Sequence, residues 1–479
     1  MIMHTHQTYN QLRKRILILF LSSFSLILGN FIPTIGCPIE GSAWMTGSAQ
    51  VDITPEGSLW MAGYASRTKP TNVKMHSLWA KALVVKDQQE NIGVFISADL
   101  VGIPKHLSDR MRDKINDKFG LSKNQIIINS SHTHSGPYMF DPFRPSSYTM
   151  PEKEIEKVKL YNEVLVNKII ALVGDAMENL APSQIYSGEG TARFQVNRRN
   201  NTESTLWQQS DLNGPNDYAV PVLKVEDESG NVKTVLFGYA CHATVLSGYE
   251  WSGDYPGFAQ LELQKEFPDA TVMFFQGCGG DQNPLPRRKE SLALQYGKTL
   301  AASVVQALQE DMTHLEPKLT TAYKEIDLKL SNPPSMSELK EFRTQNENKY
   351  FDTWADFMIE KLDRGESLIE SYPYPVQIWN LGDQKIVGLG GETVIEYSIR
   401  IKEILGRNTF VFGYSNDANC AYIPSSRILE EGGYEGKTSQ YHKGFPSVWE
   451  SSVELDILNA VTQLARENNI PLIQRSLAK

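Results

Sequence analysis

The sequence predicts an α/β protein with a mixed β-sheet core, flanking helices and a metal site at the carboxyl ends of strands. Short apolar runs typical of buried strands alternate along the chain with longer segments whose apolar residues recur at helical spacing. Several apolar runs pass straight into turns that carry polar, ionisable or glycine residues. Ligands bind outside the carboxyl ends of strands in open α/β sheets, so these turns predict one shared site.

The predicted elements follow one another without a repeat, a low-complexity block or a linker rich in Ser, Gly or Pro. Strands are expected where apolar runs are short, and helices where apolar residues return every three or four positions. The expected strands are 50–57, 78–87, 91–103, 125–134, 232–243 and 270–284, then a strand–turn–strand unit from 374 and a strand from 409. The expected helices are 106–120, 153–180, 254–267, 289–310 and one that follows Gly-Gly at 390–391, with a charged, peripheral helical segment at 336–366.

The first 43 residues are expected to be a leader outside the fold. A basic cluster at 12–15 precedes a continuous apolar run at 16–32, and small residues follow, which is the order of an export signal. A membrane anchor is the alternative, although the run is marginal for spanning a bilayer. "TIGC" at 34–37 resembles a bacterial lipobox that would lipidate Cys37, whereas "GSAW" and "GSAQ" offer cleavage sites. We therefore expect an exported protein that is periplasmic, secreted or lipid-anchored at the cell envelope.

Residues 44–479 are then expected to form a single catalytic domain. The chain is 41% hydrophobic and 22% charged with a net charge of −9, so no nucleic-acid partner is expected, and no protein partner is evident. Without Cys37 the exported chain would keep three cysteines, an odd number that does not indicate a disulfide framework. One bridge among Cys241, Cys278 and Cys420 stays open.

Two histidines end the strand expected at 125–134, in "NSSHTHSGP". His132 and His134 are two residues apart, so on a strand both side chains face the same way. They could approach one metal together, or one could bind it while the other works as an acid or base. The same His-Thr-His tripeptide at 4–6 lies in the leader and is expected to be inert. Taken alone the motif is weak, because ordinary core or surface histidines fit it equally well.

His242 and Glu392 occupy comparable positions at two other strand ends. His242 follows the apolar run at 232–241, and a core histidine beside Cys241 is the alternative interpretation. Glu392 follows "GLGG" at the start of an expected helix, where a carboxylate is also favoured by the helix dipole alone. Tyr422 and Tyr434 cannot be singled out from twenty tyrosines by physical reasoning.

A series of short motifs resembles the catalytic domain of the neutral/alkaline non-lysosomal ceramidase family. The matching stretches occur in family order over roughly residues 48–450, and "HTHSGP" at 132–137 is the most specific. The others are "VDITP" (51–55), "MAGYAS" (61–66), "LWAKALVV" (78–85), "SADL" (97–100), "VNR" (196–198), "ACHAT" (240–244), "SGDYPG" (252–257), "GGDQNP" (279–284), "GGE" (390–392) and "YIP…YEG" (422–436).

The resemblance implies a zinc amide hydrolase that cleaves the N-acyl bond of ceramide, with one catalytic zinc ion. It assigns four zinc ligands and three further active-site residues by their positions in the motifs. The implied ligands are His132, His242, Glu392 and Tyr422, and the implied catalytic residues are His134, Arg198 and Tyr434. The implied partner is a lipid-like N-acyl substrate at a membrane surface.

The sequence departs from the family at two places. The family turn Gly-Asp-x-Ser-Pro carries a serine with an assigned catalytic role, and Asn283 stands in that position here. An amide is no nucleophile, so Asn283 could only orient substrate or donate to an oxyanion. Family members also carry a C-terminal immunoglobulin-like domain, which is not expected in a chain that stops so soon after "YEG".

We therefore expect metal-activated water to attack the amide, with His134 carrying the proton and Arg198, Tyr434 and Asn283 stabilising the oxyanion. Asp281 is either an orienting partner of a ligand or a turn residue. The alternatives are a zinc deacylase or esterase acting on another acylated lipid or sugar, a binuclear amidohydrolase, and a non-catalytic surface binding protein that kept the fold. The binuclear alternative needs more well-placed histidines than the nine in this chain supply.

Overall fold

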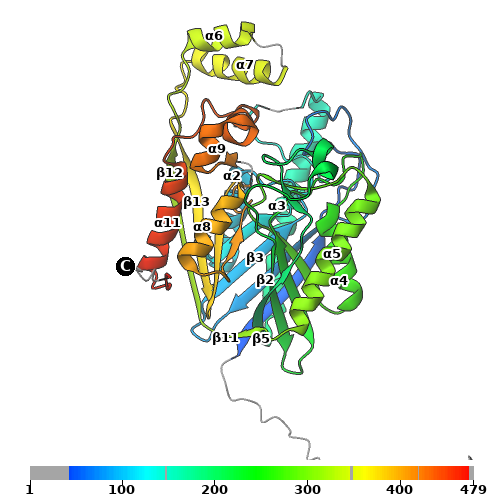
Figure 1. Ribbon diagram of the computed structural model, residues 1–479. Coiled ribbons are helices and arrows are strands. Elements are labelled where there is room, and N and C mark those ends of the chain that lie inside the picture. Colours follow the sequence, from blue (N-terminus) through cyan, green and yellow to red (C-terminus); the bar gives the residue numbers. More distant parts are fainter. Residues whose placement is uncertain (1–42, 146–147, 346–348, 419, 474–479) are drawn as a thin grey trace, which may run out of the picture. The chain divides into compact units, whose positions relative to one another are not determined.

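A curved nine-stranded mixed sheet forms the centre of the computed structural model, which describes residues 43–145, 148–345, 349–418 and 420–473 (Figure 1). The strands run in the order β4-β3-β2-β1-β5-β7-β8-β9, with β11 paired to β5. Their bounds are β1 Trp44–Asp52, β2 Trp79–Lys86, β3 Ile92–Ala98, β4 Ile126–Ser130, β5 Ala181–Thr191, β7 Ala219–Asp227, β8 Val232–Tyr239, β9 Thr271–Gln276 and β11 Thr313–Leu315. The β3–β4 and β8–β9 pairs are parallel and the other pairs are antiparallel.

The two ends of this strand order come together through buried amides. Asn129 of β4 accepts a hydrogen bond from the Gln276 backbone at 2.9 Å and donates to the Gln276 carbonyl at 3.3 Å. The segment after β16 enters the gap between β4 and β9, with isolated bridges from Asn129 to Ser415 and from Gly277 to Phe412. The loops that follow β4 and β9 therefore start side by side.

A four-stranded sheet packs against the large one. It runs β12 (Leu319–Lys329), β13 (Ser371–Leu381), β14 (Gln384–Leu389) and β16 (Phe410–Phe412). A buried apolar cluster that includes Phe95, Leu236, Phe275, Trp379 and Phe412 joins the two sheets. Short strand pairs lie beside them, β6 (Gln195–Asn197) with β10 (Gln282–Pro284) and β15 (Glu392–Thr393) with β17 (Tyr422–Ile423).

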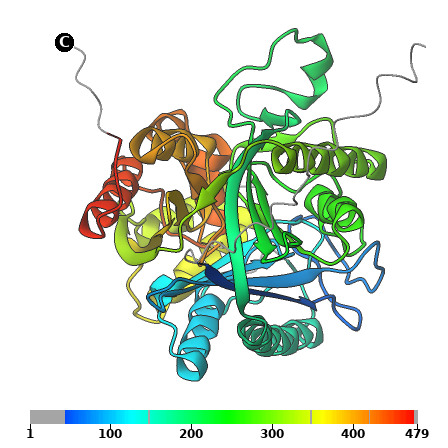
Figure 2. The same ribbon diagram turned by 90° about the horizontal axis from the view of Figure 1, so that it is seen from below.

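Helices cover the outer faces of both sheets (Figures 1 and 2). The long helix α3 buries Val158, Leu165, Ile169 and Leu172 against β1 and β2, as its apolar spacing predicts. The α-helices are α2 Lys105–Phe119, α3 Glu152–Glu178, α4 Asp254–Glu266, α5 Glu290–Gln309, α6 Met336–Gln345, α7 Lys349–Asp363, α8 Ile395–Leu405, α9 Ser426–Glu431, α10 Ser439–His442 and α11 Val453–Glu467. The π-helix η3 spans Tyr434–Thr438, and the 3₁₀ turns are η1 Lys123–Gln125 and η2 Glu203–Gln208.

The predicted α/β class with a mixed sheet and flanking helices is confirmed. The charged segment at 336–366 contains the helices α6 and α7, which pack against each other as an α6–α7 hairpin inserted between β12 and β13 in the chain. The predicted leader, including Cys37, lies outside the described residues. None of the helices within the described ranges is long and apolar enough to cross a membrane. Cys241, Cys278 and Cys420 are buried free thiols.

Candidate active site

His132 and His134 lie in the loop that follows β4, and the prediction that they sit on the strand is wrong. The strand ends at Ser130, and His132 has a left-handed backbone conformation with φ of 59°. This turn, rather than strand alternation, aims the two rings at each other. The Nε2 atoms of His132 and His134 lie 3.1 Å apart.

His242 enters the same space from the loop after β8. Its backbone N–H donates to the Gln282 carbonyl at 3.0 Å, which ties the loop to the turn that follows β9. The side chains of His132, His134 and His242 offer nitrogen atoms that all lie within 4.8 Å of one another. The strand ends therefore bring these three residues together, as the sequence predicts.

Glu392 completes the cluster from the second sheet. The expectation that it opens a helix is wrong, because it begins the two-residue strand β15, and α8 starts only at Ile395. In the parallel β15–β17 pair, Glu392 is directly opposite Tyr422. Gly391, at φ 69°, is needed at this point, because a Cβ there would lie 2.5 Å from the Ala421 carbonyl oxygen. Oε2 of Glu392 lies 3.1 Å from Nε2 of His132 and 3.3 Å from Nε2 of His242.

The protons of these histidines are placed by backbone carbonyls. Nδ1 of His132 lies 2.6 Å from the Val101 oxygen, and Nδ1 of His242 lies 2.6 Å from the Gly279 oxygen. A carbonyl oxygen only accepts, so each Nδ1 carries the hydrogen, and in the neutral ring Nε2 keeps its lone pair. Two such nitrogens then face Oε2 of Glu392, a buried oxygen that accepts no hydrogen bond from the part of the chain that the structure describes.

Several lone pairs thus point toward one another in a buried space, and a metal ion between them would remove their mutual repulsion. A site of two imidazoles, a carboxylate and a phenol has the donor atoms that Zn²⁺ accepts. The carbonyl contacts at Nδ1 also match the way in which metal-binding histidines are usually oriented. The residues therefore fit a zinc ion, and His134 is close enough to compete as a ligand.

Tyr422 connects the histidines to a second group of predicted residues. Its hydroxyl lies 3.2 Å from Nε2 of His242 and accepts from a terminal guanidinium nitrogen of Arg198 at 3.1 Å. Arg198 also donates to Oδ1 of Asn283 at 3.3 Å and from Nε to Glu435 at 2.7 Å. The ring of Tyr434 lies 5.1 Å from that of Tyr422, centroid to centroid. All the residues that the motifs single out thus lie in one continuous cluster.

Burial and neighbouring charge set the ionisation of the cluster. Burial opposes ionisation of Glu392, but His132 and Lys443 outweigh it and hold its pKa well below the usual range. Burial, together with the charge of Arg198, lowers the pKa of His242 to about 4. Burial and the two other histidines hold the pKa of His134 well below its usual value. Neutral His134 and His242 beside an ionised carboxylate suit cation binding.

Asp281 acts as a structural organiser of the turn after β9. Its carboxylate accepts from the Ile395 backbone at 2.9 Å and from Nδ2 of Asn197 at 2.8 Å. Its carbonyl accepts from the Arg198 backbone at 2.9 Å. It therefore holds the start of α8 and the Asn-Arg pair, and contacts no candidate ligand directly in these bonds.

Sequence reasoning missed three residues that contact the cluster. Lys443 lies with Nζ 3.3 Å from Oε1 of Glu392, Glu435 pairs with Arg198, and the Tyr414 ring lies 4.3 Å from that of His132. Glu435 is adjacent to Tyr434 in "YEG" and could have been noted there. Lys443 and Tyr414 carry no local signal.

A polar cleft of about 560 Å³ opens over this second group. Arg198, Asn283 and Tyr434 line it together with Arg199, Glu203 and Arg287. Tyr434 is 46% exposed, so it faces incoming solutes more than any of the candidate ligands, which are at most 4% exposed. The cleft therefore leads a substrate first to the candidate oxyanion donors.

Comparison with known proteins identifies the family. A family model described as "Neutral/alkaline non-lysosomal ceramidase, N-terminal" matches residues 44–319. Neutral ceramidase A from Dictyostelium discoideum is 23% identical over 51% of this chain and 35% of its own length. Neutral ceramidase from Pseudomonas aeruginosa is 22% identical over 82% of this chain and 69% of its own.

The match thus spans about a third of the Dictyostelium relative. The crystal structure of neutral ceramidase from Pseudomonas aeruginosa shares the fold, with a TM-score of 0.69 at 17% identity over 92% of this chain and 77% of that one. A structure titled "Ceramidase complexed with C2" gives a TM-score of 0.68 at 16% identity. Because the structural likeness covers 92% of this chain, it extends past residue 319.

Proposed function

Since this chain belongs to the neutral/alkaline non-lysosomal ceramidase family, we propose that it is a zinc-dependent amidohydrolase that releases a fatty acid from ceramide or a related N-acyl lipid. The observation that carries the proposal is the meeting of the His132 and His242 Nε2 lone pairs at Oε2 of Glu392. The names of the curated relatives support the same reaction class. The proposal includes a leader at 1–43, a single catalytic domain at 44–479, and action at a lipid surface outside the cytoplasm.

His132, His242, Glu392 and Tyr422 would hold one zinc ion in this mechanism. When bound, zinc supplies an activated water and polarises the substrate carbonyl. His134 is the proton carrier, because its Nε2 lies 3.1 Å from Nε2 of the candidate ligand His132 and its depressed pKa leaves it unprotonated at neutral pH. Its Nδ1 is buried and makes no hydrogen bond to the residues that the structure describes.

Arg198 and Tyr434 stabilise the negative charge that develops on the carbonyl oxygen. Arg198 keeps its full charge because Tyr422 and Glu435 outweigh the effect of burial and raise its pKa. Asn283 accepts from Arg198 and so positions the guanidinium. An amide side chain cannot form an acyl-enzyme, so the proposed route is direct attack by water.

A deacylase for a more polar acylated substrate is the second candidate. The polar cleft carries Arg199 and Arg287, which favours a headgroup with many hydrogen-bond acceptors. Glu435 and Glu203 already pair with these arginines at 2.7 and 3.0 Å, so the cleft also offers acceptors to a hydroxylated headgroup.

The deciding experiment incubates purified protein with N-acyl and O-acyl lipids and acylated sugars, and reads released products by mass spectrometry. Each reaction is run with zinc, and with a chelator followed by zinc. Zinc-restored hydrolysis of ceramide supports the first candidate, and hydrolysis of esters or acylated sugars alone supports the second. A metal-free protein without activity on any substrate would indicate a non-catalytic binding protein.

A further inference from the structure

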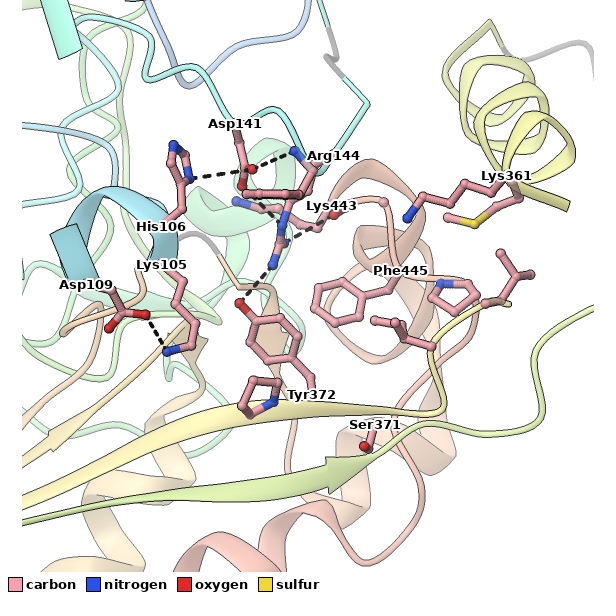
Figure 3. A pocket seen from close by; sticks show the side chains of 17 residues that line it. Lys105, His106, Asp109, Asp141, Arg144, Lys361, Ser371, Tyr372, Lys443 and Phe445 are labelled. Atoms are coloured by element: carbon pink, nitrogen blue, oxygen red, sulfur yellow. Dashed lines mark hydrogen bonds and ion pairs between the residues drawn. The ribbon is translucent and has the colours of Figure 1, made fainter. Parts of the chain in front are cut away.

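A cavity of about 450 Å³ lies next to the metal cluster and has no part in the mechanism above (Figure 3). Its walls come from the start of α2, the loop at 141–144, helix α7, the segment 368–373 and the segment 443–446. Its size is within the range of small-molecule sites. Helix α7 of the α6–α7 hairpin supplies one wall, so this insertion would contribute to ligand binding.

The charged groups on one side of the cavity are already neutralised. Lys105 pairs with Asp109 at 2.8 Å and with Glu325 at 2.6 Å. Arg144 pairs with Asp141 at 3.3 Å, and its guanidinium lies 4.8 Å from the centre of the Phe445 ring. Figure 3 shows the Lys105–Asp109 and Arg144–Asp141 pairs. A small anion would have to displace the existing carboxylates, so this side does not favour one.

The opposite side of the cavity is apolar. Met358 is 1% exposed, Leu368 9% and Phe445 1%, and these side chains form a buried wall. Ile369 and Phe143 are exposed by 44% and 68% and also line the cavity, so apolar surface continues to the outside. A hydrocarbon chain is the ligand that such a surface would stabilise most, because binding removes the apolar area of both the chain and the cavity wall from water.

One lysine side chain connects this cavity to the candidate metal centre. Lys443 lines the cavity, and its Nζ lies 3.3 Å from Oε1 of Glu392. One stretch of chain contributes to the walls of both. Tyr434 and Glu435 line the polar cleft, and residues 443–446 line the cavity. The cluster is therefore bordered by a polar cleft and by a cavity with one apolar side.

We propose that this cavity binds the acyl chain of the substrate, so that the chain packs against α7 and Ile369 while the polar part occupies the cleft at Arg198. The inference rests on the proposed function, since it places the scissile carbonyl between the two. Lys443, at the junction, then lies close to the carboxylate that hydrolysis releases. The α7 wall sets which chain lengths are accepted.

The test compares Ile369→Asp with Leu455→Asp. Both residues are exposed apolar side chains, but Leu455 lies on α11 and does not line the cavity. For Ile369→Asp, kcat/KM on N-palmitoyl sphingosine is expected to fall at least about tenfold and on the N-acetyl analogue to change less than about twofold. Leu455→Asp is expected to alter neither value. Equal losses on both substrates, or no loss on either, would overturn the proposal.

A binding measurement separates this inference from the proposed reaction. The fluorescent fatty acid cis-parinaric acid is titrated into the zinc-loaded protein and its two variants, with thermal melting as a check on folding. Binding by wild type and Leu455→Asp but not by Ile369→Asp supports the cavity even if ceramide is not the substrate. Binding that Ile369→Asp leaves unchanged would place the chain elsewhere. Lost probe binding without any chain-length effect on hydrolysis would make the cavity a separate lipid site and would contradict the proposal.

Discussion

The ammonium group of Lys443 lies 3.3 Å from Oε1 of Glu392, on the side of the carboxylate that faces away from the histidines. The other oxygen, Oε2, faces Nε2 of His132 and of His242. The two oxygens of one carboxylate thus have different partners. Lys443 leaves Oε2 as the oxygen that a metal ion would meet and keeps Glu392 ionised.

Lys443→Met is expected to weaken zinc binding by about 10- to 100-fold, as is typical when the partner of a ligand is removed. Lys443→Arg is expected to keep most of the affinity, because it preserves the charge. Competition with a chromophoric chelator measures both. Lys361→Met is the matched control, since Lys361 lines the same cavity and its contact is with the Phe357 ring. An unchanged affinity in Lys443→Met would show that Glu392 is oriented without it.

Substitution of His132 and His134 should separate metal binding from proton transfer. His132→Ala is expected to lose both zinc and activity. His134→Ala is expected to retain zinc while kcat falls by about 10²–10⁴-fold, the range for loss of a general base. Zinc content by atomic emission and kcat on ceramide check the two expectations. Equal loss of zinc in both variants would make all three histidines ligands.

Much of this site could be predicted because apolar runs end sharply in the sequence. The ends of β4, β8 and β9 correctly placed His132, His242 and the turn with Asn283 on one side of the sheet. The local geometry was not predictable, because the left-handed turn at His132 depends on the Val101 carbonyl and the neighbouring segment after β16. The sequence therefore predicted the correct cluster of residues, although it placed His132 and His134 on a strand and the structure places them in a loop.

Other parts were missed because their signals are weak or non-local. The strand β5 contains glycine, proline and polar residues, β7 has a proline inside its short apolar stretch, and β12 mixes polar and apolar residues, so none carries a clear strand signal. These segments form strands because they pair with neighbouring strands in the folded sheets. Lys443 follows a short helix far from Glu392 in sequence, and only the folded chain brings the two together.

Gly63→Ala is expected to lower kcat strongly, by about 10²-fold, because a displaced catalytic group loses its alignment. Gly63 has φ of 98°, and a Cβ there would lie 2.6 Å from Cβ and Cγ of His134. Gly57→Ala is the control, since nothing lies within 4 Å of its Cβ position. Steady-state kinetics and zinc content are compared, and zinc is expected to stay bound in both. Full activity in Gly63→Ala would show that the His134 ring can move without loss.

Asn283→Ala is expected to reduce kcat by about tenfold, as removal of a positioning contact does, and not to abolish it. The reason is that Asn283 accepts from Arg198 and is no nucleophile. Acid quenching during turnover, followed by intact-protein mass spectrometry, is expected to find no acylated protein. A covalent acyl adduct in wild type would contradict direct attack by water.

Asp254 is expected to make stability depend on pH in the acidic range. It is fully buried at the start of α4, and its carboxylate accepts from the backbone of Val245, Leu246 and Tyr255 at 3.2, 2.8 and 2.7 Å. Burial raises its pKa to about 6, against the lowering effect of these three bonds. A carboxyl group with a raised folded-state pKa holds its proton more tightly in the folded than in the unfolded chain.

The stabilisation from protonated Asp254 is therefore fully present below the unfolded pKa of 3.8 and is lost as the pH rises through about 6. The shift corresponds to roughly 3 kcal/mol of unfolding free energy. Asp254→Asn cannot titrate, so the wild-type minus variant difference in unfolding free energy should fall by this order between about pH 4 and pH 7. Urea unfolding of both proteins at matched zinc concentration measures it, because the metal contribution cancels. A difference that stays constant over this range would mean that Asp254 ionises in the folded protein as it does in the unfolded chain.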